Sequence, residues 1–96
     1  MIVLNVFYEF DKAGERERYL KALCDKGIVA DSRAEAGNLK YDYYFAEGSD
    51  TELLLVEHWA DAAVLDAHTR TSHFQAIPSV KEQFNVTVRL ERYETA

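Results

Sequence analysis

The stretch "LKYDYYFAEGSDTELLLVEHW", residues 39–59, carries two strand patterns with one turn between them. Apolar and polar side chains alternate over residues 39–46, and residues 53–59 are again rich in the aliphatic and aromatic side chains of strands. The "EGSD" of residues 47–50 supplies the glycine and small polar residues that are typical of a hairpin loop. The stretch therefore predicts an antiparallel hairpin in the middle of the chain.

A strand and a helix are predicted before this hairpin. Residues 2–10 are β-branched and aromatic, which favours a strand. Residues 15–36 carry apolar side chains three and four apart, which predicts one amphipathic helix, although Gly27 weakens its middle. Cys24 falls on an apolar position of this helix, so we expect a buried structural thiol there. The Gly-Asn pair that begins at Gly37 is typical of a helix end.

Three helical pieces and a strand are predicted after the hairpin. Asp61 is a suitable N-cap for the first helix. Thr71 or Ser72 can cap a further helical turn, and Pro78 fits near the start of a last helical piece. Residues 85–93 alternate between apolar and polar side chains, which predicts a final strand.

The resulting order of strand, helix, strand, strand, helix and strand is that of the ferredoxin-like fold. We therefore predict an α+β chain with βαββαβ order, folded as a single domain over residues 1–96. In this fold the four-stranded antiparallel sheet has the first and third strands in its centre and helices on one face only.

Both central strands are apolar on both faces. In the first strand Leu4 points to one face and Val3 to the other, and the third strand has Leu55 opposite Leu54. Helices on one side leave the second apolar face uncovered, and apolar patches of that extent are interaction surfaces. We therefore predict a twofold homodimer in which two sheets pack face to face.

The composition argues against several partners. With 17 Asp and Glu against 11 Lys and Arg the net charge is −6, and no basic stripe marks a nucleic-acid surface. No run approaches the roughly 20 apolar residues of a membrane span, and the first residues lack the basic leader of a signal peptide. A single cysteine cannot form an internal disulfide. We expect a cytoplasmic protein that binds neither nucleic acid nor membrane.

Residues 57–77 contain all three histidines and the only tryptophan. Strand alternation places Glu57 on one face of the third strand and His58 on the other. A glutamate in a central strand needs a partner, and the simplest is an ion pair with Arg89 or Arg92.

His68 lies on the same helical face as Leu65 and is predicted to point into the cleft between helix and sheet. His73 is five residues further, about 140° around an ideal helix, and is expected at the rim. The competing interpretation of His68 is structural: a histidine at a helix end that bonds a nearby carbonyl.

No metal or nucleotide motif is present. His68 and His73 are five residues apart rather than the four that place two ligands on one helical face, and Cys/His clusters, P-loops and dinucleotide fingerprints are absent. We therefore expect no metal and no cofactor. What remains is an apolar, aromatic pocket that suits an aromatic or oxygenated small molecule. Its predicted lining residues are Asn5, Tyr43, Glu57, Leu65, His68, Ser72 and His73.

The segments "GNLKYDYYF" and "LLLVEHWADAAVLDAHTRTSHFQAI" together resemble the antibiotic biosynthesis monooxygenase (ABM) domain family. The shared patterns are E-x-G-N-x-x-Y at the second strand, E-x-W at the end of the third, and A-H-x-x-T-x-H-F on the helix. The resemblance spans nearly the whole chain and is most specific over residues 35–74. It implies a dimeric α+β barrel, in agreement with the two-faced sheet.

The resemblance also implies a set of activities. Members include cofactor-free monooxygenases of quinols and phenols, heme-degrading enzymes, and enzymes that process a phosphorylated autoinducer-type signal. The heme-degrading branch has a tryptophan at the position of His68 and a heme-ligating histidine near residues 76–79, and this chain has neither. Carried over, His68 becomes the catalytic candidate for proton transfer. A flat substrate ring would lie against the aromatic side chains of Phe7, Tyr43, Trp59 and Phe74.

Three functions stay open at this point. The first is a cofactor-independent monooxygenase of a quinol or related phenolic. The second is an isomerase for a phosphorylated signal, for which Arg70 and Lys40 are a small supply of phosphate anchors. The third is a non-catalytic dimeric binding module, in which aromatic side chains would fill the cleft around His68.

Overall fold

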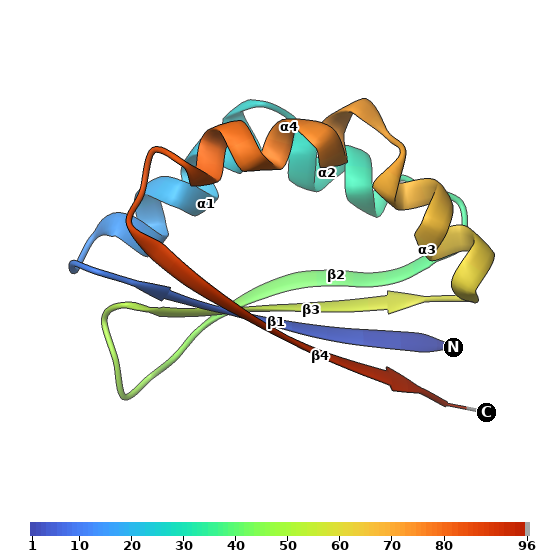
Figure 1. Cartoon of the computed structure of the whole chain (residues 1–96), viewed down its shortest axis with the longest axis horizontal. Helices are drawn as coiled ribbons and strands as arrows, with labels where there is room; N and C mark the ends of the chain where they lie inside the picture. Colours follow the sequence, from blue (N-terminus) through green and yellow to red (C-terminus); the bar gives the residue numbers. More distant parts are fainter. Residues whose placement is uncertain (96) are drawn as a thin grey trace.

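Within residues 1–95, which the computed structural model describes, four strands form one antiparallel sheet and four helices lie on one of its faces (Figure 1). In chain order the elements are β1 (Ile2–Phe10), α1 (Glu15–Asp25), α2 (Ile28–Arg33), β2 (Asn38–Phe45), β3 (Glu52–Trp59), α3 (Ala62–Thr69), α4 (Ser72–Lys81) and β4 (Val86–Glu94). The strand order β2-β3-β1-β4 places the first and third strands in the centre. The predicted ferredoxin-like α+β fold is confirmed, with two helices before the hairpin, where one was predicted, and two after it, where three helical pieces were predicted. None of the described helices is long and apolar enough to cross a membrane.

The strand register assigns each side chain to one face of the sheet. Leu4 of β1 lies opposite Glu57 of β3 and Arg92 of β4, so these three side chains share the face that the helices cover. The next residue, Asn5, lies opposite Val56 and belongs to the other face. All pairs are antiparallel, as expected for strands joined by a hairpin and by helical crossovers.

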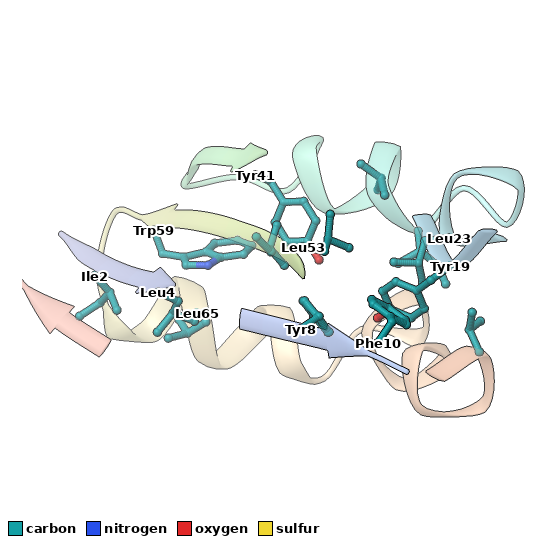
Figure 2. Packing of buried hydrophobic residues seen from close by; sticks show 14 residues of the cluster. Ile2, Leu4, Tyr8, Phe10, Tyr19, Leu23, Tyr41, Leu53, Trp59 and Leu65 are labelled. Atoms are coloured by element: carbon teal, nitrogen blue, oxygen red, sulfur yellow. The ribbon is translucent and has the colours of Figure 1, made fainter. Parts of the chain in front are cut away.

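The hydrophobic core fills the space between the sheet and the helices (Figure 2). At one end Tyr19 of α1 lies 5.4 Å, between ring centroids, from both Tyr8 and Phe10. At the other end Trp59 is fully buried near Leu65 of α3. Burial of these large side chains fixes the distance between the helices and the sheet, and with it the depth of the cleft described below.

The single helix predicted over residues 15–36 is wrong, because the chain breaks it at Gly27. Gly27 adopts a φ of 75°, a left-handed conformation that glycine reaches without steric cost. The break lets Ile28 pack into the core at the start of α2. The buried thiol predicted for Cys24 is also wrong, since Cys24 is exposed. The buried face of α1 passes through Tyr19 and Leu23, and one residue further the side chain points about 100° away.

The predicted break at Pro78 is wrong as well, because α4 continues through it. A proline inside a helix loses one backbone hydrogen bond, but Val80 in the next turn is fully buried and holds the helix against the core. The N-caps of α3 and α4 are formed by residues that the sequence predicted as caps. Asp61 accepts a backbone N–H in the first turn of α3, and the Thr71 hydroxyl accepts the N–H of Phe74 in α4.

Over residues 1–95 no helix covers the second face of the sheet (Figure 1). Along its central strands this face is apolar and half-buried, through the side chains of Val3, Phe7, Leu54 and Val56. The Arg89 guanidinium lies 4.0 Å from the centroid of the Phe7 ring, and both border a hollow of about 740 Å³. We refer to this surface below as the open face.

Candidate functional site

A cleft of about 600 Å³ lies between the sheet and helices α3 and α4. Its walls are mainly apolar and come from both layers, through Leu4, Val6, Tyr8, Tyr41, Leu55, Leu65, Phe74 and Ile77. The polar side chains of Glu57 and His68 also line it, as do the charged side chains of Lys81 and Arg92. A mostly apolar cleft with few polar groups is the usual form of a small-molecule site.

His68 stands in the last turn of α3 and is 2% exposed. Its ring lies 4.4 Å from the ring of Trp59 and 5.1 Å from that of Phe74, centroid to centroid. Burial lowers the pKa of His68, and this effect outweighs the neighbouring Glu35, which acts to raise it. The imidazole is therefore predominantly neutral near pH 7, with one nitrogen protonated and the other free to accept.

Glu35 decides which nitrogen of His68 carries the hydrogen. The Glu35 Oε2 atom lies 2.5 Å from His68 Nδ1. A carboxylate can only accept, so Nδ1 donates and Nε2 becomes the ring nitrogen available to a molecule in the cleft. The structural interpretation, in which His68 bonds a backbone carbonyl, is not what the structure shows.

His73 joins the same carboxylate from the second helix. Its Nε2 atom lies 2.8 Å from Glu35 Oε2, and its ring centroid lies 5.9 Å from that of His68. The expected rim position of His73, apart from His68, is therefore wrong. That expectation continued one helix from His68 to His73, whereas the chain turns between α3 and α4 at Arg70 and Thr71. The change of helix direction brings the two rings together.

The backbone around Glu35 is tightly held. Glu35 lies between α2 and β2, where its N–H bonds the Ser32 carbonyl and its own carbonyl accepts the N–H of Asn38. Gly37, with a φ of 86°, packs directly on α3: a Cβ at this position would lie 2.5 Å from Val64 Cγ1. Sequence reasoning did not select Glu35 as a site residue. The signal was nevertheless there, because Glu35 is the first residue of the E-x-G-N-x-x-Y pattern.

The three side chains form a two-histidine, one-carboxylate set. One ligand atom each from Glu35, His68 and His73 can be chosen so that all three lie within 4.8 Å of one another. The spacing argument from the sequence did not anticipate this set, because it considered ligands on one helix only. Chemically, the arrangement can orient an imidazole base toward the cleft, and it also presents the donor atoms that zinc-class metal ions use.

Glu57 is bonded to an indole rather than to an arginine. The Trp59 Nε1–H donates to Glu57 Oε1 over 3.0 Å, and Glu57 is 6% exposed. Among the described residues no ion pair reaches Glu57, so the predicted pairing with Arg89 or Arg92 is wrong. Burial, only partly offset by the indole bond, raises the pKa of Glu57 to about 7.

Four of the other predicted pocket residues lie in the cleft wall or directly behind it. Leu65 and Phe74 line the cleft, as predicted. Trp59 lies behind His68, and Tyr43 packs beside Tyr41 without lining the cleft itself.

Four predicted lining positions are wrong, those of Asn5, Phe7, Ser72 and His73; the last of these side chains bonds Glu35 and does not line the cleft. Asn5 and Phe7 lie on the open face, since their neighbours Leu4 and Tyr8 take the cleft face. Ser72 is exposed at the start of α4 and does not line the cleft.

Comparisons with known proteins agree with this fold and these motifs. The family described as "Antibiotic biosynthesis monooxygenase" matches residues 1–78. A protein of Bacillus subtilis (strain 168), named "Putative monooxygenase YcnE", is 33% identical over 95 residues, which cover 98% of this chain and 97% of that protein. A solved structure of a conserved protein from Bacteroides thetaiotaomicron VPI-5482 is 30% identical, with a TM-score of 0.84 over 98% of this chain and 96% of that one. A structure from Deinococcus radiodurans shares the fold at 21% identity, with a TM-score of 0.83 over 100% of this chain and 93% of that one. The chain described here belongs to the antibiotic biosynthesis monooxygenase family, the family that its motifs resemble.

Proposed function

We propose that the protein is a cofactor-independent monooxygenase that acts on a quinol or a related phenol, with His68 as the catalytic base. The observation that carries this proposal is the placement of His68 in the wall of an apolar cleft, held there by the Glu35 carboxylate. Family membership supports the class of reaction. The cleft supports the class of substrate, since its mainly apolar walls suit a flat ring.

The chemistry begins with a proton transfer to His68. The phenolic hydroxyl gives its proton to Nε2, and the electron-rich phenolate passes one electron to O₂. The substrate radical and superoxide combine at a ring carbon that bears a hydrogen, and the resulting peroxide anion takes the proton back from Nε2 to become a hydroperoxide. Loss of water then leaves a carbonyl at that carbon. One atom of O₂ remains in the product and the other leaves as water.

The neighbours of His68 act by restricting it. Glu35 fixes the Nδ1–H form, which leaves Nε2 as the accepting nitrogen. Trp59 packs against the imidazole at an interplanar angle of 34° and Phe74 meets it edge-on, so the ring has little freedom to rotate. Glu35 and Trp59 are therefore positioning residues in this proposal, and only His68 exchanges a proton with the substrate.

Oxygen consumption by chelator-treated protein with a panel of quinols tests the proposal. We expect His68→Gln, which can keep a hydrogen bond to Glu35, to lower the rate by about 10²- to 10⁴-fold, the usual contribution of a positioned base. His58→Gln is the matched control, because His58 lies on the open face and should leave the rate unchanged. Circular dichroism checks that both variants fold. Absence of oxygen uptake with every electron-rich phenol would contradict the proposal.

We also propose that the protein is a homodimer whose two open faces pack against each other. The support is the half-buried apolar row along β1 and β3, which a partner sheet would remove from water. Leu54 lies in the middle of this row, opposite Phe7.

The second candidate function is isomerisation of a phosphorylated hydroxy-ketone. Lys81 and Arg92 both line the cleft and offer cationic anchors for a phosphate. The anchors expected from the sequence lie elsewhere: Arg70 pairs with Asp66, and Lys40 lies over the Tyr44 ring. Saturable amide shifts of Lys81 and Arg92 on titration with a sugar phosphate, together with no oxygen uptake, would favour this candidate.

A non-catalytic binding module receives less support. That function predicts a cleft filled by aromatic side chains and a His68 that bonds only backbone. Instead the cleft is open, and the histidine bonds a carboxylate. Both observations favour an enzyme.

A further inference from the structure

We propose that Glu35, His68 and His73 form a binding site for one divalent transition-metal ion of the zinc class. The three side chains come from the loop before β2, from the end of α3 and from the start of α4. Glu35 Oε2 lies 2.5 Å from His68 Nδ1 and 2.8 Å from His73 Nε2. This site does not depend on the proposed oxygenase activity.

The donor set determines the class of ion. Two imidazole nitrogens and one carboxylate oxygen suit Zn²⁺ or Co²⁺, whereas Mg²⁺ and Ca²⁺ prefer oxygen ligands throughout. Bonds of about 2.0–2.2 Å in a tetrahedral site place neighbouring donor atoms roughly 3.4 Å apart. The donor atoms here lie within 4.8 Å of one another, with Oε2 closer to each nitrogen than a metal requires. Small side-chain rotations that separate the carboxylate from the two rings would therefore open a cavity of the right size.

The site is partly open to solvent through Glu35 and His73, neither of which lines the cleft. The side chains of Glu35 and His73 are 15% and 16% exposed, while that of His68 is 3% exposed. Their backbones are already fixed by the bonds around Glu35 and by the Thr71 hydroxyl, which donates to the His68 carbonyl and accepts from Phe74 N. Three preplaced protein ligands leave a fourth position for water, the arrangement of open zinc sites.

Occupation of this site would change what His68 presents to the cleft. A metal ion on Nδ1 takes the place of the hydrogen that Glu35 now accepts, so the neutral ring must carry its hydrogen on Nε2. Nε2 would then donate and could not accept a substrate proton. The metal-bound protein would therefore lack the base that the proposed oxygenase needs, and metal binding would act as a reversible block of that activity.

Cobalt binding to untagged, chelator-treated protein tests the site directly. We expect one equivalent of Co²⁺ to give the visible absorption of a four-coordinate site, and Zn²⁺ to displace it. Glu35→Gln and His73→Ala should each weaken binding by at least about 100-fold, since even outer partners of a metal ligand are worth about 10- to 100-fold. Both side chains are less buried than His68, so these variants are the better choice for keeping the fold, which thermal unfolding confirms.

His58→Ala is the matched control, because this histidine lies on the open face and should leave binding unchanged. The proposal is overturned if the wild-type protein shows no saturable binding, or if the Glu35 and His73 variants bind as well as the wild type. Oxygen uptake is a separate readout. Oxygen uptake without metal binding would contradict only the proposed metal site. Metal binding without oxygen uptake would contradict only the proposed oxygenase activity.

Discussion

Glu57 is a buried carboxyl group whose only hydrogen-bond partner among the described side chains is the indole of Trp59. Its pKa is raised from 4.5 to about 7, mainly by burial. Between these two values the folded protein holds a proton that the unfolded chain has lost. The free energy of unfolding therefore falls as the pH rises from about 4.5 to about 7, and stays at the lower level above that. The titratable or charged side chains around Glu57 are those of Tyr8, Glu35, Tyr41, His68 and Arg92.

Glu57→Gln should remove this pH dependence. The amide oxygen can still accept the Trp59 N–H, but the side chain no longer ionises. We expect the variant to be more stable than the wild type at about pH 8, by on the order of 3 kcal/mol, with the advantage shrinking toward pH 5. Urea unfolding at both pH values measures the difference. Glu52→Gln, an exposed glutamate in the same strand, is the control. Equal pH dependence of wild type and Glu57→Gln would refute the prediction.

At the scale of elements, Gly37 sets the contact between the loop that carries Glu35 and helix α3. Gly37 combines a left-handed φ with a close approach to the Val64 side chain. Gly37→Ala should therefore destabilise the fold by on the order of 2 to 4 kcal/mol, the sum of backbone strain and overpacking. The variant should also loosen His68, which α3 carries. Gly48→Ala is the control, since a Cβ there meets nothing within 4 Å. Equal melting temperatures for the two variants would show that this contact is not tight.

Helices and strands were predictable where a single local pattern determines them. Alternation and strand-forming composition together located all four strands, and Asp61 and Thr71 capped helices as their side chains suggest. The breaks were not predictable, because Gly27 and Pro78 each permit two outcomes and tertiary packing decides between them. Gly27 ends a helix because Ile28 then reaches the core, whereas Pro78 is tolerated because Val80, two residues further, is fully buried.

The face of the side chain was predictable for Glu57, His58 and His68 but was mispredicted for Asn5 and Phe7, and the contacts within the site were not predictable. Alternation placed Glu57 and the open-face His58 as the register has them, and helical periodicity placed His68 in the cleft. The bond between Glu35 and the two histidines joins residues 33 and 38 positions apart, across a loop and a helix turn. The periodicity of a single helix or strand cannot predict a contact between residues so far apart in the sequence. A charged residue inside a dense motif was the only sequence signal.

At the scale of the whole molecule, the predicted dimer depends on the open face. A lysine at Leu54 would place a charge in the middle of the contact between sheets, where burial without a partner is costly. We expect Leu54→Lys to sediment as a folded monomer where the wild type sediments as a dimer. Gln75→Lys adds the same charge on the outer surface of α4 and should remain dimeric. A wild-type protein that is monomeric at micromolar concentration would contradict the prediction.

The contact between Trp59 and His68 gives the protein an internal optical reporter. Trp59 is the only tryptophan in the chain, its ring lies 4.4 Å from the imidazole, and its N–H bonds Glu57. Its indole fluorescence therefore comes from one place, between the candidate base and the buried acid. A ligand that enters the cleft, or an ion that binds behind His68, alters the surroundings of this one fluorophore. The emission of the unlabelled protein can thus follow binding at the site before any substrate is known.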